Sequence, residues 1–138
     1  MCLLDAVEDW TADRIHCTAR THQAFDHPLR WQNRLSAVHL IEYAGQAIAL
    51  HGALLAQDHA GQRENRGQTR PRLGMFGALR DVRFHANRID LLVDPLSVVA
   101  HRRLARADGM VYDFTVGAGE QALCDGRAVI ALGDMLGV

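Results

Sequence analysis

Lysine is absent from this 138-residue sequence, and all fifteen of its basic residues are arginine. This absence excludes any reaction that uses a lysine as a general base or as the amine of a Schiff base. The arginines are balanced by sixteen acidic residues, which leaves a formal net charge of −1. A general nucleic-acid-binding protein is normally clearly basic, so the charge balance argues against that class.

Cysteine is also scarce, since only Cys2, Cys17 and Cys124 are present and none of them forms a C-x-x-C pair. This odd number predicts neither a complete disulfide framework nor a zinc site. We interpret the three cysteines as small apolar residues in a reducing cytoplasm. The sequence has no basic segment ahead of its first apolar residues, and polar residues interrupt its longest apolar stretch. We therefore expect a cytoplasmic protein without a signal peptide, a membrane span or a membrane partner.

The sequence is rich in apolar residues, which make up 49% of the chain. At this length the chain predicts one domain over residues 1–138, with a sizeable core. From residue 35 to about residue 57, Ala, Leu and Ile dominate without a proline, and apolar residues fall on every side. This pattern predicts a long helix that is buried on most of its faces, with Ser36 as its candidate cap. Residues 58–72 are polar and contain two glycines and a proline, so we expect a mobile loop there.

The remaining segments predict β-strands. Residues 14–21 alternate apolar and polar side chains with a period of two, which is typical of a half-buried strand. Asp108 and Gly109 form a strong hairpin signal between two further strands. The expected strands cover residues 2–7, 14–21, 76–86, 96–107, 110–116 and 122–132. Two strands, a buried helix and four strands follow one another in the order of the hotdog fold, an α+β architecture in which an antiparallel sheet wraps a long central helix.

Three segments resemble, in the correct order, those of the β-hydroxyacyl-acyl carrier protein dehydratases. LIEYAGQ at residues 40–46 is similar to the L-x-E-A-x-A-Q segment of the family's central helix. CLLDAV at residues 2–7 resembles the opening strand F-L-L-V-D-R-V, and FGALRDVRF at residues 76–84 resembles the A-G-I-x-x-A-R-F strand. More narrowly, MCLLD together with IEYAGQAIALHGALL resembles a dehydratase-like subgroup of aryl-polyene and similar polyketide-type pathways.

The resemblance implies a dimer whose active sites lie between hotdog subunits. In each site a histidine removes the C2 proton of a 3-hydroxyacyl thioester, while a carboxyl group of the partner's central helix handles the departing 3-hydroxyl group. The product is a 2-enoyl thioester, which makes the enzyme a hydro-lyase. The substrate is carried on the phosphopantetheine of an acyl carrier protein or on CoA, and no metal or organic cofactor is implied.

Carried onto this sequence, the resemblance assigns the acid to Glu42 and the base to His27. His27 lies in Phe25-Asp26-His27-Pro28-Leu29, where the family has G-H-F-P-G. The resemblance assigns substrate binding to Gln46, Phe76 and Gly77.

The spacing of the residues indicates a second candidate base. His39 precedes Glu42 by three residues, so the two side chains share one face of the expected helix. Glu42 itself lies in an apolar stretch, where we expect burial. A buried carboxyl group has a raised pKa, which suits a general acid. The alternative is an exposed Glu42 or one paired with an arginine.

The sequence contains eight histidines, but they predict no metal site. His39 and Glu42 are too few, because a metal site normally has three or four protein ligands. A cluster of arginines offers a surface for an acidic carrier protein or, alternatively, only a solvated face. Its members are Arg63, Arg66, Arg70, Arg72, Arg80, Arg83 and Arg88.

Two other functions remain open. In a hotdog thioesterase, the helix acid would activate water against the same class of thioester. In a heterodimer of two hotdog subunits, this chain would be the non-catalytic one. The absence of the family's glycines around His27 is what such a subunit would show.

Overall fold

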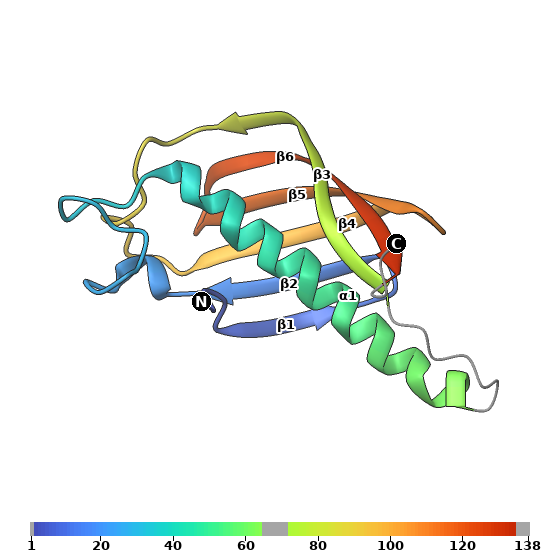
Figure 1. The fold of residues 1–138 in the computed structure, drawn as a ribbon. Coiled ribbons are helices and arrows are strands. Elements are labelled where there is room, and N and C mark those ends of the chain that lie inside the picture. Colours follow the sequence, from blue (N-terminus) through green and yellow to red (C-terminus); the bar gives the residue numbers. More distant parts are fainter. Residues whose placement is uncertain (1, 65–71, 135–138) are drawn as a thin grey trace.

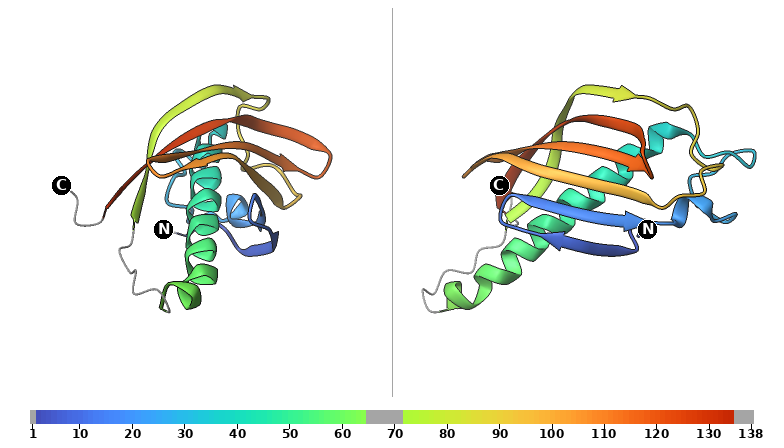
Figure 2. Two further views of the ribbon diagram at one scale, coloured as in Figure 1. Left: turned by 90° about the vertical axis from the view of Figure 1, so that its right-hand side faces the viewer. Right: turned by 180° about the vertical axis from the view of Figure 1, so that it is seen from behind.

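A curved antiparallel sheet wraps one long helix in the computed structural model of the chain, which describes residues 2–64 and 72–134, with side chains for residues 2–58 and 77–132. The helix, α1 (Leu40–Glu64), crosses the concave face of the sheet at a slant (Figures 1 and 2). The order of the six strands across the sheet is β1-β2-β4-β5-β6-β3. The strands are β1 (Ala6–Trp10), β2 (Arg14–Ala19), β3 (Arg72–Phe84), β4 (Leu96–Arg106), β5 (Gly109–Ala118) and β6 (Gln121–Asp134).

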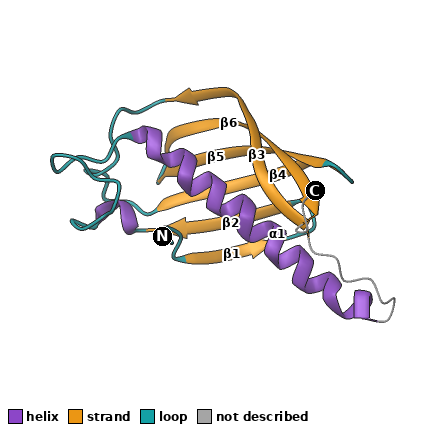
Figure 3. Ribbon diagram, in the orientation of Figure 1, coloured by secondary structure: helices purple, strands orange, loops and turns teal. Residues whose placement is uncertain are grey.

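The sheet confirms the expected hotdog arrangement of strands around a central helix (Figure 3). In β2 the apolar positions Ile15, Cys17 and Ala19 are buried, as their alternation predicted. The expected hairpin between β4 and β5 is present, but its two turn residues are Ala107 and Asp108, because Gly109 already belongs to β5 and pairs with Arg106. The first strand differs from the expectation, because it begins at Ala6 and runs to Trp10. Residues 2–5 precede it and are held by other contacts, described below.

The boundaries of the helix also differ from the expectation at both ends. Residues Ala37–His39 form a 3-10 turn, and the Ser36 hydroxyl accepts a hydrogen bond from the Val38 amide at 3.3 Å. The helix begins only at Leu40 and continues to Glu64, so the expected loop start at residue 58 is wrong. Ala, Gln and Glu, which occur in this part of the helix, have a higher intrinsic helix propensity than residues typical of turns, so a helix can continue there without packing on the sheet. Its last turns therefore project beyond the sheet (Figure 1), and the rest of the expected loop, residues 65–71, lies outside the described residues.

One side of α1 packs on the sheet and the other is open within the single chain. Tyr43, Ala44 and Ala47 are buried, whereas Glu42 and Ala49 are exposed. The expectation of a helix buried on most of its faces is therefore not met by this chain alone. The expectation counted every alanine as an apolar, buried position. Alanine also has the highest helix propensity at exposed positions, so its presence does not show which face of the helix is buried.

Gly126 of β6 leaves room for two side chains of the neighbouring strands, Phe114 of β5 and Val82 of β3. A Cβ at this position would lie 2.8 Å from Cζ of Phe114 and 2.9 Å from Cγ2 of Val82. We expect Gly126→Ala to lower the free energy of unfolding by about 1–3 kcal/mol in urea denaturation, because the core is overpacked. Gly52→Ala in α1 is the control, since no atom outside its own helical turn lies within 4 Å. It should stabilise the protein by up to about 1 kcal/mol through helix propensity, and equal effects of the two variants would contradict the close packing.

Candidate active site

Glu42 lies in the first turn of α1 and is held by a residue one turn later. Gln46 donates a hydrogen bond from Nε2 to Oε1 of Glu42 at 3.4 Å. The Oε1 atom of Gln46 accepts a hydrogen bond from the amide of Leu3 at 2.7 Å. The Glu42 side chain is exposed, so its expected burial is not found within the chain. The physical reason is its position, because the next two residues of the helix face the sheet and Glu42 is left on the open side.

His39 is the last residue of the 3-10 turn and is partly exposed. It precedes Glu42 by less than one turn. Within the described part of the chain, no group forms a hydrogen bond to its ring. His39 lies close enough to His27 to help lower the pKa of that residue. The imidazole of His39 therefore forms no hydrogen bond within the described residues and lies near both Glu42 and His27.

His27 is buried in a chain of hydrogen bonds. Its Nδ1 atom accepts a hydrogen bond from the amide of Leu29 at 3.1 Å. The proton of the neutral ring is therefore assigned to Nε2, which donates to the hydroxyl of Tyr43 at 3.1 Å. The Tyr43 hydroxyl lies 2.7 Å from Oγ1 of Thr21, which donates to the carbonyl of Leu3 at 2.7 Å. The donors thus run in one direction, from His27 to the Leu3 carbonyl.

This arrangement leaves His27 without a free nitrogen lone pair. Burial is the main cause that lowers the pKa of His27, and the neighbouring His39 and Arg30 lower it further. A low pKa keeps the ring neutral, but a neutral imidazole acts as a base only through its unprotonated nitrogen. That nitrogen is occupied by the amide of Leu29.

Sequence reasoning missed Tyr43 and Thr21, which connect His27 to the N-terminal segment. Tyr43 had a signal in the sequence, because it stands where the family segment L-x-E-A-x-A-Q has its first alanine. Thr21 had none, since its partners lie far from it along the chain. Among the described residues, no hydrogen bond joins Glu42 to either histidine.

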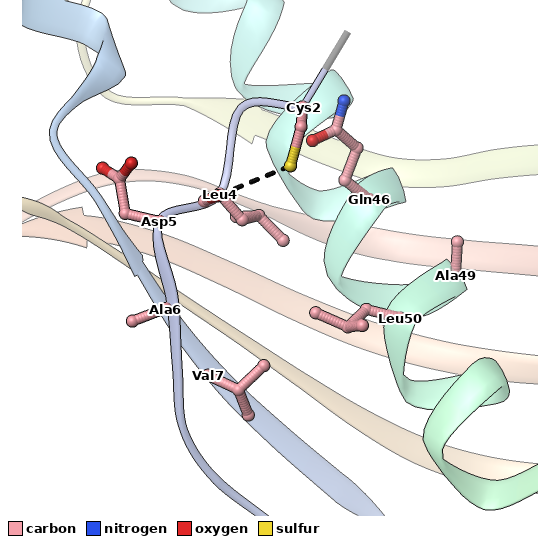
Figure 4. A pocket seen from close by; sticks show the side chains of 8 residues that line it. All are labelled: Cys2, Leu4, Asp5, Ala6, Val7, Gln46, Ala49 and Leu50. Atoms are coloured by element: carbon pink, nitrogen blue, oxygen red, sulfur yellow. Dashed lines mark hydrogen bonds between the residues drawn. The ribbon is translucent and has the colours of Figure 1, made fainter. Parts of the chain in front are cut away.

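A cleft of about 450 Å³ lies between the N-terminal segment with β1 and the helix α1. Leu4 and Val7 point toward the helix, and Leu50 points back toward the strand (Figure 4). Cys2 and Gln46 lie together at one end of the cleft (Figure 4). Gln46 therefore lines the cleft and also forms a hydrogen bond with Glu42, so the cleft adjoins the candidate acid.

The chain matches a known protein family over nearly its whole length. The model of the ApeP-like family, described as ApeP dehydratase, matches residues 1–134. The chain belongs to this family. Membership confirms the resemblance to the dehydratase-like subgroup that the segments at residues 2–7, 40–46 and 76–84 indicated.

Solved structures show the same fold at low sequence identity. The dehydratase heterocomplex ApeI:P from Xenorhabdus doucetiae has a TM-score of 0.77 and 19% identity, over 99% of this chain and 86% of that one. A thioesterase from Haemophilus influenzae has a TM-score of 0.63 and 12% identity, over 94% and 78%. A mutant thioesterase from Pseudomonas aeruginosa has a TM-score of 0.64 and 11% identity, over 94% and 81%. No curated protein sequence matches the chain significantly.

Two substrate-binding assignments of this ApeP-like chain stay predictions. Phe76 pairs with Ile130 through the backbone of β3, but its side chain lies outside the described residues. Gly77 is exposed at a bulge next to it.

The arginine cluster does not form one patch in the part that the structure describes. Arg80 is exposed, Arg83 lies 3.5 Å from Asp125, and Arg88 forms an ion pair with Asp90. The other four members have side chains outside the described residues. Within residues 2–64 and 72–134, no three His, Cys, Asp or Glu residues gather as metal ligands. No helix in these ranges is long and apolar enough to cross a membrane.

Proposed function

We propose that this chain is a subunit of a 3-hydroxyacyl-thioester dehydratase in which Glu42 is the general acid. The observation that carries the proposal is the carboxylate in the family's helix segment, held by Gln46 and exposed on the side of α1 that the sheet leaves open. A second subunit or a substrate can reach Glu42 from that side. Membership of the ApeP-like dehydratase family supports this reaction class.

The proposed base is His39, with His27 as the family-derived alternative. The ring of His39 is not engaged by hydrogen bonds within the described residues, whereas both nitrogens of His27 are. The base removes the C2 proton, and the electron pair of that bond forms the C2=C3 double bond. The C3–O bond breaks, and the hydroxyl group leaves as water with the proton of Glu42. Proton exchange with solvent then restores both groups.

The proposed partners follow from the same reaction. The substrate is delivered on the phosphopantetheine of an acyl carrier protein or on CoA, and the chemistry needs neither a metal nor an organic cofactor. A second hotdog subunit completes the site, either as a copy of this chain or as a different one. The heterocomplex ApeI:P, a relative by fold, supports the second arrangement.

A second candidate function is the non-catalytic half of such a heterocomplex. The engaged nitrogens of His27 favour it, because the family's base position then has no base to offer. The hotdog thioesterase is the third, supported by the thioesterases that share the fold.

One assay separates the three functions. The purified chain is incubated with a short 3-hydroxyacyl pantetheine thioester, alone and with a second hotdog subunit that carries an intact G-H-F-P-G segment. Absorbance of the conjugated enoyl thioester and release of free thiol are followed in the same sample. Enoyl product that depends on Glu42 supports the dehydratase. Product that needs the second subunit but not Glu42 identifies a non-catalytic half, and thiol release without enoyl product identifies a thioesterase.

A further inference from the structure

The cleft between β1 and α1 has an apolar floor and one polar end. Leu4 and Val7 line one wall, and Ala49 and Leu50 line the other. Asp5 is the charged residue among the lining residues, and its carboxylate points away from the helix (Figure 4). Val7 is 36% exposed, so apolar surface here is left to solvent in the single chain. A volume of about 450 Å³ is within the range of small-molecule sites, which are mostly apolar with a few polar groups.

The polar end of the cleft is shared with the candidate active site. Gln46 lines the cleft and donates a hydrogen bond to Glu42, which lies one helical turn nearer to the start of α1. From Glu42 to Leu50 the helix rises by about 12 Å. A thioester whose C3 atom lies at Glu42 would therefore extend its acyl chain past Gln46 and along the apolar walls.

We propose that this cleft binds the acyl chain of the thioester and that Ala49 sets the length of chain it accepts. The proposal rests on the proposed function, because the continuity with Glu42 identifies the occupant as substrate. Ala49 is exposed and presents only a methyl group to the cleft. A larger side chain at this position would fill the space that lies beyond Gln46.

Cys2 provides a direct reporter of occupancy. Its thiol lies at the polar end of the cleft, 3.6 Å from the carbonyl oxygen of Leu4, and the residue is exposed. Cys17 and Cys124 are buried, and burial raises the pKa of each thiol to about 11. Because the thiolate is the reactive form, alkylation at neutral pH will occur first at Cys2.

The test measures alkylation of Cys2 by iodoacetamide in the presence of acyl-pantetheine amides, which can undergo neither elimination nor thioester hydrolysis. We expect the decanoyl amide to slow the alkylation by about tenfold at concentrations where the butyryl amide does not, since each buried methylene adds affinity. Ala49→Leu should remove the protection by the decanoyl amide. Ala105→Leu, at an exposed alanine of β4, should leave it unchanged. Thermal unfolding of both variants establishes that they are folded.

The outcomes separate this inference from the proposed function. Equal alkylation with and without the decanoyl amide, or protection that survives Ala49→Leu, would overturn the inference even in an active dehydratase. Protection that Ala49→Leu removes, in a chain without dehydratase activity, would keep the acyl-binding cleft and overturn the proposed function alone.

Discussion

Glu42→Gln is expected to lower the turnover of a 3-hydroxyacyl thioester by at least about a hundredfold, the usual contribution of a general acid or base. The amide keeps the shape of the side chain and can still accept the hydrogen bond of Gln46, but it has no proton to give to the leaving hydroxyl group. The effect is measured as the rate of enoyl absorbance at saturating substrate. Glu120→Gln, at an exposed carboxylate between β5 and β6, is the matched control and should retain full activity.

The two histidine variants identify the base. His39→Ala should lower turnover by a factor similar to that of Glu42→Gln, without a large change in stability. His27→Ala should mainly lower the free energy of unfolding, because it removes the donor to Tyr43 and leaves the Leu29 amide unpaired. The opposite pattern, with turnover lost in a folded His27 variant and kept in the His39 variant, would make His27 the base. Its ring would then have to leave the Leu29 amide during the reaction.

Acidification through pH 6.5 is expected to reduce the stability of the folded chain steeply. Among the described residues, three histidines are buried: His22, His27 and His51. Burial lowers the pKa of each below its ordinary value of 6.5. Because the unfolded chain binds these protons at a higher pH than the folded chain, their stabilisation is complete above pH 6.5 and is lost as the pH falls toward the folded values. Each histidine then contributes a slope of about 1.4 kcal/mol per pH unit.

The contacts of His51 show why the folded state keeps a neutral ring. Its Nε2 atom lies 2.8 Å from the Thr11 carbonyl, to which it donates, and its Nδ1 atom accepts from the hydroxyl of Tyr112 at 2.5 Å. Burial raises the pKa of Tyr112 to about 12, so this hydroxyl keeps its proton. Arg102 nearby lowers the pKa of His51 further, whereas Asp13 opposes the shift.

Urea denaturation at pH values on both sides of 6.5 measures the effect. His51→Asn should reduce the slope of stability against pH, even if it lowers stability at every pH. A stability that stays level as the pH falls well below 6.5 would show that the buried histidines do not control acid unfolding.

Local patterns in the sequence determined the order of the elements. The alternation in β2, the hairpin between β4 and β5, and the alanine-rich helix each depend on residues that are neighbours along the chain. The three segments at residues 2–7, 40–46 and 76–84 together indicated the family, and the helix segment among them singled out Glu42 and Gln46. Boundaries were less well predicted, because Ala, Gln and Glu continue a helix beyond the point where tertiary contacts end.

Only the tertiary structure decided what each candidate residue can do. Whether Glu42 is buried depends on which side of α1 the sheet covers, and an alanine-rich helix does not specify that side. The tautomer of His27 depends on one backbone amide, that of Leu29, and on Tyr43, which comes to it from the helix. The cleft exists because residues 2–7, at the start of the chain, lie beside residues 46–50 of the helix. Such contacts join residues that are distant in the chain. The sequence did not predict them because the packing of the folded chain, and not the neighbouring residues, sets which side chains are buried and which atoms donate or accept hydrogen bonds.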